Sequence, residues 1–502
     1  MANIPILNDR KNPLISILIY NYSGQKLQEC LESIITQTAL RNFEIIFVDD
    51  SSSDGSWETA IAYAYKYDGL ISMTRNKVSI GPALNLFKCF RMSRGKYLVP
   101  LYFDKDFRAK YVSDAIISME CNASAKFLGV YRDTESQVVE AKLSATGDFF
   151  DDLLVEPEPL VSVCIYNYNY GRYLRQCFDS VFAQTYSRFE ICFSDNASTD
   201  DSFSIALEYM RDHPGVMTII RNRKNFGPSS NLENCQLSAR GKYQLKLCSD
   251  DAIQPEFLEK AVSALESHAD AGSVMVHRSI IDEAGNETQE VPFYSKSCVI
   301  PGDEQAAVYM MSSVNPSISQ VMYNTQRTYG KRIVGTLTDR WFGDWIQDFN
   351  MCCEYSMVYL NEPLLLHRVH SGSDGSSIDK NLIQCFAQYV LFHQFAGIAS
   401  SYGHSKAESR LSESITKLSR LCLRYSIRFL CSGDEESGRR YYYLALAINS
   451  TITVEPAFSE LSAYWNSSDT VEREQILFSF KNANNLVARS ISYDPPPGSI
   501  LL

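Results

Sequence analysis

The sequence predicts an α/β protein that is built on a mostly parallel, doubly wound sheet and followed by a helical part. Short apolar runs rich in β-branched residues alternate with stretches whose apolar residues recur at helical spacing. The strands and helices follow one another in the order that parallel crossovers require. After residue 378 the strand-like runs fade and helical spacing continues.

The strand–helix pattern occurs twice, at a constant offset of 146 residues. "PLISILIYNYS" begins at Pro13 and "PLVSVCIYNYN" at Pro159. The same offset relates "FEIIFVDDSSSDGS" from Phe43 to "FEICFSDNASTDDS" from Phe189, and the later motif "RGKY" also recurs. Matching at one offset predicts a duplicated unit.

Within each copy the predicted elements follow in a fixed order. "LISILIY" and "LVSVCIY" are apolar and β-branched, as buried parallel strands are. "LQECLESIITQT" and "LRQCFDSVFAQT" have helical spacing, "FEIIFVDD" is a second strand, and "SSSDGSWETAIAYAYK" begins with capping residues and continues as a helix. "GKYLVPLYFD" and "GKYQLKLCSDD" form a later strand. Ligands bind beyond the carboxyl ends of such strands. The polar residues at these ends are Asp49, Asp50, Asp195, Asn196, Asp250 and Asp251.

Composition excludes several classes of protein. The 502 residues are 45% hydrophobic and 21% charged, with a net charge of −12 that argues against a nucleic-acid binder. No apolar run reaches the roughly 18–20 residues of a membrane helix, and "MANIPILNDRKNP" has no signal-peptide core. We therefore expect a cytoplasmic protein, with peripheral contact to a membrane left open. Its 14 cysteines include no C-x-x-C pair, so we expect free thiols.

Composition and spacing also predict the domain organisation. A Pro/Gly-rich end, "ARSISYDPPPGSILL", follows two amphipathic helical patterns, which we expect to pack as core. The predicted segments are an N-terminal tail (1–12), a degenerate half domain (13–120), a linker (121–158), a catalytic domain (159–378), a helical domain (379–485) and a flexible tail (486–502).

The second copy resembles the family-2 glycosyltransferases of the GT-A fold. The resemblance rests on "VSVCIYNYNYGRYLRQCFDSVFAQTY", "FSDNASTDDS", "NFGPSSN", "ARGKYQLKLCSDDAIQPEFL", "FGDWIQDF" and "LNEPLLLHRVHSG", in this order within 159–375. The first copy matches only the front half, so the resemblance implies a GT-A domain preceded by a partial GT-A-like repeat. It implies inverting transfer of a sugar from a UDP- or dTDP-sugar donor to a glycan or lipid-linked acceptor, with Mn²⁺ or Mg²⁺.

The resemblance also implies roles for individual residues. Tyr168 and Asn196 fall where the family lines its base and ribose pocket. Asp250, on the ribose side, and Asp251, a metal ligand, fall on its D-x-D-type motif. His370 matches a histidine that helps to hold the metal and the diphosphate.

The same resemblance identifies Asp344, in "FGDWIQDF", as the catalytic base. The sequence departs from the family pattern at three places. Cys248 replaces the first acid of the D-x-D-type motif, Asn196 replaces an acid, and His367 stands at a tyrosine-like position, where it competes with His370 for one role.

The chemistry of these residue types agrees with those roles but leaves alternatives open. Mg²⁺ and Mn²⁺ prefer oxygen ligands, yet adjacent acids also cap helices, and "AIQPEFLEKAV" follows Asp251. A carboxylate such as Asp344 can take the proton of an attacking hydroxyl. The alternative is that Asp344 and Asp348, one helical turn further on, are both solvated acids on the surface of a helix. His370 is a ligand or a structural histidine. Tyr166, Tyr168 and Tyr170 would share one face if the strand continued through them, which offers aromatic surface to a base.

The first copy lacks the acid pair. Asp104 corresponds to Asp250, but Lys105 corresponds to Asp251, and a protonated lysine cannot ligate a metal. We therefore expect one reaction site, in the second copy. The rival interpretation is a non-catalytic scaffold that binds a nucleotide sugar or a glycan. A nucleotidyltransferase would need a Gly-rich, basic triphosphate loop, which "YNYNYGRY" does not supply.

Overall fold

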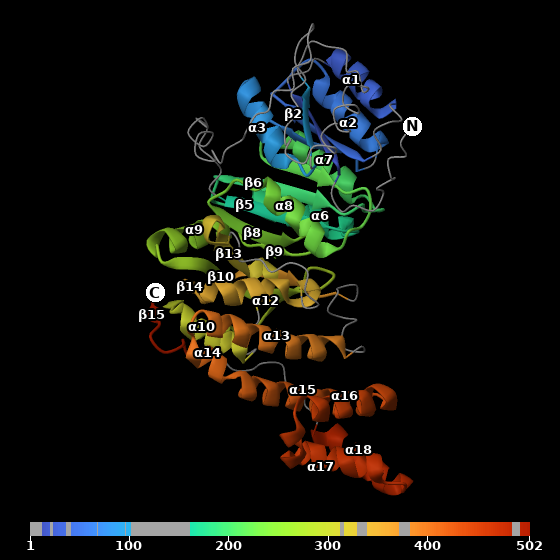
Figure 1. Ribbon diagram of the computed structural model, residues 1–502, viewed down its shortest axis with the longest axis vertical. Helices are drawn as coiled ribbons and strands as arrows, with labels where there is room; N and C mark the ends of the chain where they lie inside the picture. The colour runs from blue at the N-terminus through green and yellow to red at the C-terminus, as the bar shows by residue number, and fades with distance from the viewer. Residues whose placement is uncertain are drawn as a thin grey trace, which may run out of the picture. The chain divides into compact units, whose positions relative to one another are not determined.

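The computed structural model confirms the α/β class, the mostly parallel strands and the helical C-terminal part (Figure 1). It describes residues 13–20, 24–36, 42–67, 69–95, 97–101, 161–311, 316–328, 339–370, 382–483 and 492–502. The predicted N-terminal tail and linker, together with Asp104 and Lys105, lie outside the described residues. The chain divides into an N-terminal unit, residues 1–250, and a C-terminal unit, residues 251–502.

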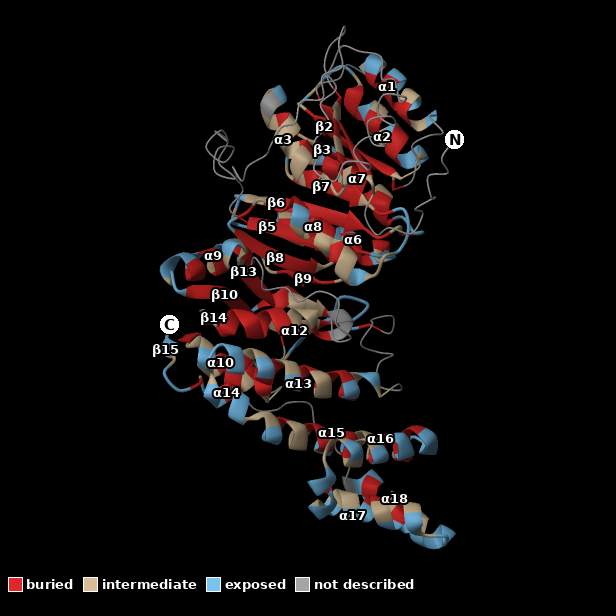
Figure 2. Ribbon diagram, in the orientation of Figure 1, coloured by how far each residue is buried: buried red, intermediate tan, exposed pale blue. Residues whose placement is uncertain are grey.

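The N-terminal unit consists of two successive sets of alternating strands and helices. The first βα segment comprises β1 (Ile15–Tyr20), α1 (Gly24–Thr36), β2 (Phe43–Asp49), α2 (Ser56–Lys66), β3 (Ile71–Arg75), α3 (Pro82–Met92) and β4 (Tyr97–Leu101). The second βα segment comprises β5 (Val161–Asn167), α6 (Gly171–Phe182), β6 (Phe189–Asp195), α7 (Ser202–Asp212), β7 (Met217–Arg221), α8 (Pro228–Ser238) and β8 (Tyr243–Cys248). These strands lie in the order β8-β5-β6-β7-β3-β2-β1-β4. They are largely buried, which explains their continuous apolar runs (Figure 2).

The two βα segments meet edge to edge through β3 and β7, which pair antiparallel. Met73 lies opposite Ile219, and Thr74 lies opposite Thr218. Met73 and Ile219 are separated by the sequence offset of 146, so residues at corresponding positions face each other. Such self-matched antiparallel pairing is the geometry of a local two-fold axis. It also covers two strand edges that would otherwise be open.

Glycine at position 69 is required by this junction. Gly69 has φ +65°, and a Cβ there would lie 2.6 Å from the backbone nitrogen of Arg223. Gly55 has φ +85° but open space around it. We expect Gly55→Ala to cost about 1–2 kcal/mol for the left-handed backbone alone. Gly69→Ala should cost about 1–3 kcal/mol more, because the methyl group overpacks the junction.

Urea unfolding of the full chain measures the difference between these two glycine variants. Equal losses in the free energy of unfolding would contradict the close approach at Gly69.

The C-terminal unit begins with a mixed sheet. Its first elements are β9 (Ala252–Ile253), α9 (Phe257–Ser267), β10 (Ala271–Ile281), β11 (Glu287–Gln289), β12 (Cys298–Ile300), α10 (Gly302–Met310), η1 (Ile318–Gln320), β13 (Val321–Asn324), α11 (Thr325–Thr328), α12 (Asp339–Cys352) and β14 (Ser356–Arg368). Helices follow: α13 (Ile383–Ser401), α14 (Ser405–Ser409), α15 (Leu411–Cys431), α16 (Glu435–Ile448), η4 (Ser450–Val454), α17 (Pro456–Asn466) and α18 (Thr470–Ala483). The last strand is β15 (Ile500–Leu501), in the order β15-β12-β14-β10-β13, with β9 on β14 and β11 on β10.

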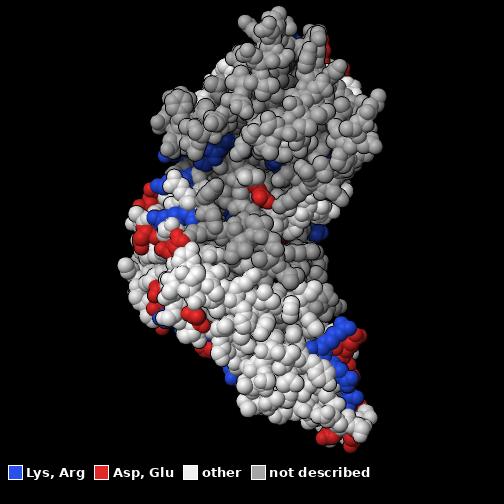
Figure 3. Space-filling model, viewed as in Figure 1, with Lys and Arg blue, Asp and Glu red and all other residues white. Residues whose placement is uncertain are grey.

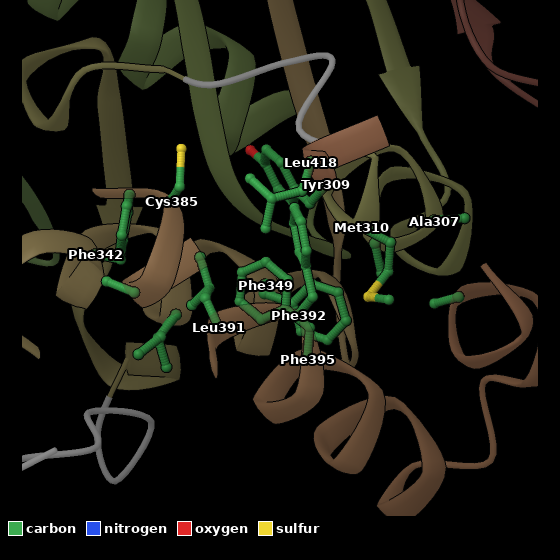
Figure 4. Close-up of a cluster of buried hydrophobic side chains, with 14 of the residues drawn as sticks. Ala307, Tyr309, Met310, Phe342, Phe349, Cys385, Leu391, Phe392, Phe395 and Leu418 are labelled. Atoms are coloured by element: carbon green, nitrogen blue, oxygen red, sulfur yellow. The ribbon is translucent and has the colours of Figure 1, made fainter. Parts of the chain in front are cut away.

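The helical part shares its core with this sheet. Side chains from α10, α12, α13 and α15 form one buried cluster (Figure 4). In it the rings of Phe349 and Phe395 stack with centroids 4.1 Å apart. The cluster extends from Met275 in the sheet to Phe480 in α18. This continuity explains why the unit boundary does not fall at residue 378, where the sequence predicts it.

The last eleven residues are hydrogen-bonded to the rest of the C-terminal unit, so the prediction of a flexible tail is wrong for them. Strand β15 pairs antiparallel with β12, and the backbone of Tyr493 bonds to those of Phe293 and Ser295. A Pro/Gly-rich composition predicts mobility, but it does not prevent the backbone from adding to a sheet edge. Residues 486–491 of the predicted tail lie outside the described residues.

The outer helices carry charges of both signs. An exposed ion pair joins Arg440 to Glu436, and a partly exposed pair joins Arg473 to Glu435. Figure 3 shows acids and bases gathered together at one end of the helical part. The exposed pair of Arg440 and Glu436 contributes little to stability. Within the described ranges, no helix is both long and apolar enough to cross a membrane.

Candidate functional site

The acid pair lies in a short turn between β8 and β9. Strand β8 ends at Cys248, and β9 begins at Ala252. Helix α9 begins only at Phe257, with Glu256 as its N-cap residue. The acids are therefore too far from that helix to cap its first turn, and the helix-capping alternative does not hold.

Asp251 is held by the strand that carries the late histidine motif. The antiparallel pairing of β9 with β14 sets Ala252 opposite Leu366, so Asp251 faces the next residue, His367. The Oδ1 atom of Asp251 accepts a hydrogen bond from the backbone N–H of Arg368 (2.9 Å) and lies 3.0 Å from Nδ1 of His367. Two groups on one strand therefore orient this carboxylate.

The second oxygen of Asp251 is in a position to bind a ligand. Asp251 is 1% exposed, and its Oδ2 atom is buried without a hydrogen-bond partner among the described residues. Burying an unsatisfied carboxylate oxygen is costly, so such atoms are usually completed by an ordered water, a cation or a ligand. Ligand atoms of Cys248, Asp250 and Asp251 all lie within 4.8 Å of one another. Two carboxylates suit Mg²⁺ or Mn²⁺, and the residues present fit such an ion.

The predicted base lies on helix α12 of the C-terminal unit. Asp344 is half-buried and follows an irregular residue, Phe342, whose φ of −141° and ψ of 23° interrupt the helix. Asp348 is buried and accepts a hydrogen bond from the hydroxyl of Tyr323 (2.6 Å). Burial, together with the charges of Asp348 and nearby Asp344, raises the pKa of Tyr323 well above its usual value. Asp348 therefore has a structural role, as one side of a buried hydrogen bond.

His370 lies two residues beyond β14, in the same unit as Asp251 and Asp344. Its side chain is buried, with 5% exposed. A buried imidazole next to the end of a strand is suited either to a ligand role or to packing. The metal-holding role of His370 stays a prediction.

The three tyrosines at the end of β5 do not share one face. The strand ends at Asn167, and Asn169 has φ +58°, which breaks the alternation of side chains. The hydroxyl of Tyr166 lies 3.1 Å from Sγ of Cys248. Tyr168 is 43% exposed, and Tyr170 is the N-cap residue of α6. The exposed ring of Tyr168 is free to meet a base from solvent, and this role stays a prediction.

Asn196 is buried and its amide is fully hydrogen-bonded. Its Nδ2 donates to Oδ1 of Asn225 (2.8 Å) and to the carbonyl of Gly227 (3.2 Å). Its Oδ1 accepts from Nδ2 of Asn222 (2.9 Å) and from the backbone N–H of Phe226 (3.0 Å). An amide offers two donors and one acceptor oxygen, and all are used here. Asn196 therefore shapes the loop 225–227, which follows β7.

Asp50, in the corresponding position of the first βα segment, is engaged in the same way. Its carboxylate accepts from the backbone N–H of Ile80 (2.8 Å) and Gly81 (3.1 Å), and from Ser79 and Asn76. Burial alone would raise the pKa of Asp50, but these hydrogen bonds hold it below the usual value. Asp50 in the first segment and Asn196 in the second thus each hold, by hydrogen bonds, the loop that follows the third strand of the segment.

The structure gives definite surroundings to Cys248 and His367. Cys248 was treated as a lost acid, whereas the thiol lies among the potential ligand atoms. His367 was expected to be a rival of His370, an outer partner of the ligands or a packed residue, and its contact with the carboxylate of Asp251 agrees with the role of an outer partner. The spacing in "LLLHRVH" leaves both histidines possible, because a two-residue strand such as β9 has no recognisable pattern.

The chain is an α/β protein with an acid-lined turn beyond a parallel strand, the position at which sheets of this kind bind ligands. Residues 15–109 and 162–313 match the model of the family described as "Glycosyl transferase family 2". These two stretches of the chain belong to this family.

Curated relatives resemble part of the chain. The chondroitin synthase of Escherichia coli is 34% identical over 128 residues, which are 26% of this chain and 18% of the relative. The putative glycosyltransferase EpsE of Bacillus subtilis (strain 168) is 33% identical over 127 residues, 25% of this chain and 46% of the relative. The aligned part covers less than half of each of these relatives.

Among solved structures, S. aureus TarS 1-349 in complex with UDP covers 68% of this chain and 98% of its own, at 15% identity and a TM-score of 0.42. The mannosyltransferase PcManGT from Pyrobaculum calidifontis, in complex with GDP-Man and Mn²⁺, covers 65% of this chain and 86% of its own, at 15% identity and a TM-score of 0.37. Likenesses this weak do not assign a function.

Proposed function

We propose that this chain is a metal-dependent, inverting glycosyltransferase that moves a sugar from a nucleotide sugar to an acceptor hydroxyl in glycan assembly. The observation that carries the proposal is Oδ2 of Asp251, a buried carboxylate oxygen without a hydrogen-bond partner among the described residues. The match of the chain to the glycosyltransferase family model supports sugar transfer as the class of reaction.

The residues of the turn would hold a divalent cation. Asp251 offers its unpartnered oxygen, Asp250 a second carboxylate and Cys248 a thiol. His370 is a further proposed ligand. When bound, such a cation supplies positive charge against a leaving diphosphate. His367 and the backbone of Arg368 keep the Asp251 carboxylate in one orientation, as outer partners of metal ligands do.

Asp344 is the proposed general base. As the acceptor oxygen forms its bond to the anomeric carbon, its proton moves to the carboxylate of Asp344. The bond from that carbon to the diphosphate oxygen breaks, and its electron pair leaves with the nucleoside diphosphate. Attack from the face opposite the leaving group inverts the configuration at that carbon.

The donor is proposed to be a UDP- or dTDP-sugar, with the base beside Tyr168 and the loop that Asn196 holds. The acceptor is proposed to be a glycan or a lipid-linked sugar. A nucleotide-sugar donor in general agrees with the match to the glycosyltransferase family model.

Thermal unfolding of the purified chain tests this function. A ligand that binds only the folded state raises the unfolding midpoint. We expect stabilisation by a nucleotide sugar in the presence of Mn²⁺, and little without it. Stabilisation without any turnover on glycan acceptors would favour a non-catalytic nucleotide-sugar scaffold instead.

Replacement of Asp104 and Lys105 together by Ala tests the one-site expectation. Lys105 stands where a metal-binding acid would be needed, so these positions should not take part in transfer. Turnover should stay within about a few-fold of the unaltered chain, as for changes away from a site. Loss of transfer in a folded double variant, checked by circular dichroism, would make the first βα segment an active participant.

A further inference from the structure

A buried polar network lies behind the loop that Asn196 holds. Asn222, the first residue after β7, donates from Nδ2 to Oδ1 of Asn196 (2.9 Å). The Oδ1 atom of Asn222 accepts from Nδ2 of Asn234 on α8 (2.9 Å). Asn196 and Asn222 are each 2% exposed. Because an amide presents its donor and acceptor on opposite sides, whatever fixes the carbonyl of Asn222 also fixes its donation to Asn196.

Arg94, from the first βα segment, enters this network. Its Nη1 donates to Oδ1 of Asn222 (2.9 Å). Its Nε and Nη2 pair with Oε2 of Glu44, at 2.8 and 2.7 Å. The side chains of Arg94 and Glu44 are 8% and 2% exposed. The planar guanidinium serves both partners at once, which the single ammonium of a lysine cannot do with the same geometry.

The edge-to-edge pairing explains how this arginine reaches a different segment. Strands β3 and β7 run antiparallel, so the amino ends of the first segment's strands lie beside the carboxyl ends of the second segment's strands. Arg94 precedes β4, and Glu44 lies near the start of β2. Asn222 follows β7. The first segment thus presents a buried ion pair to the ligand-facing edge of the second.

The corresponding position in the first segment has a different partner. Asn76 stands 146 residues before Asn222, and its Oδ1 accepts from Nζ of Lys88 (2.6 Å), a residue of its own segment. Asn234 replaces that lysine in the second segment and is shorter and uncharged. The cationic donor to Asn222 therefore comes from the other segment, through Arg94. Because Arg94 replaces a donor from within the second segment, the first segment takes part in the hydrogen-bond network of the second.

We propose that Arg94 is a positioning residue for the nucleotide pocket of the second βα segment. It acts through Asn222 and Asn196 on the loop 225–227, and it touches no substrate. The first segment, which has a lysine at the position of the metal-binding acid, thereby contributes orientation to the site rather than chemistry. This inference rests on the proposed function, because it assumes that the loop borders a bound nucleotide.

Calorimetry with UDP and Mn²⁺ on the full chain tests the proposal. Arg94→Met should weaken UDP binding about 2- to 30-fold, the range for positions that act on a site through intermediates. Asn222→Ala should weaken it to a similar degree. If the two residues act in one line, the double variant should bind UDP no more weakly than Asn222→Ala alone. A donor KM that rises while kcat is kept would agree with a role in positioning.

Arg240→Met is the matched control. Arg240 forms the corresponding ion pair with Glu190, through Nε (2.9 Å) and Nη2 (2.7 Å), and lies 146 residues after Arg94. Its loss should lower the unfolding midpoint much as Arg94→Met does, without a similar loss of UDP affinity. Arg94→Lys keeps a charge beside Glu44, so we expect it to recover stability but not UDP affinity.

The outcomes separate this inference from the proposed function. Unchanged UDP affinity in folded Arg94→Met, or equal weakening in Arg240→Met, would overturn the positioning role. So would full recovery of affinity in Arg94→Lys. If Arg94→Met does not fold, Arg94→Lys and Asn222→Ala carry the same test. A native chain that binds none of UDP, dTDP and GDP with Mn²⁺ would contradict the proposed function itself.

Discussion

Asp344→Asn is expected to lower turnover about 10²- to 10⁴-fold, the usual contribution of a general base. The amide is nearly isosteric with the carboxylate but does not take the proton of the acceptor hydroxyl. Donor binding should change little, because the base acts on the acceptor. Initial rates at saturating donor, together with calorimetric binding of UDP and Mn²⁺, measure both effects.

Asp348→Asn is the control on the same helix. Asp348 is buried and accepts a hydrogen bond from the hydroxyl of Tyr323. Its replacement should therefore reduce the stability of the fold and leave the general base, Asp344, in place. If turnover fell more in Asp348→Asn than in Asp344→Asn, at equal folding, the assignment of the base would move to Asp348. A loss of UDP affinity in Asp344→Asn as large as its loss of rate would instead indicate a structural role.

Asp251→Asn should remove most of the Mn²⁺ dependence of UDP binding. The substitution turns a buried, unpartnered carboxylate oxygen into an amide, which is a poorer ligand for a hard cation. We expect the loss in metal affinity to exceed the roughly 10- to 100-fold that follows removal of an outer partner of a ligand. Titration of UDP at several Mn²⁺ concentrations measures it.

His367→Gln provides that outer-partner comparison. The amide can still donate towards Oδ1 of Asp251, but it does not reproduce the imidazole. Its effect on Mn²⁺-dependent binding should be smaller than that of Asp251→Asn. An Asp251→Asn chain that is folded and keeps the native response to Mn²⁺ would contradict the metal assignment.

The site combines features that the sequence predicts to different degrees. The acid pair at the end of a strand was visible because "QLKLCSDD" ends an apolar run in two acids. The contact of Asp251 with His367 was not, because it depends on β9, a two-residue strand that joins positions more than a hundred residues apart. Local patterns report strand ends, whereas contacts between distant residues depend on how strands pair.

The junction of the two βα segments was likewise beyond the sequence. The offset of 146 predicts two similar sets of elements, but not that they join through β3 and β7. Neither β3 nor β7 was predicted from the sequence, because these five-residue strands have no pattern that marks an edge. The corrected tail has the same cause, since β15 adds to the edge of β12 despite its Pro/Gly-rich approach.

The sequence by itself determined the α/β class, the order of the strands and helices that it identified in each copy, and the acids at the strand ends. Those features follow from periodicity and composition within short windows of the chain. Only the tertiary structure decided that Asp251 has a buried oxygen without a hydrogen-bond partner among the described residues, that the amide of Asn196 is hydrogen-bonded to a loop, and that Arg94 donates a hydrogen bond to Asn222. Each of these depends on burial and on hydrogen bonds between distant residues, and such bonds are set by how strands pair rather than by local pattern.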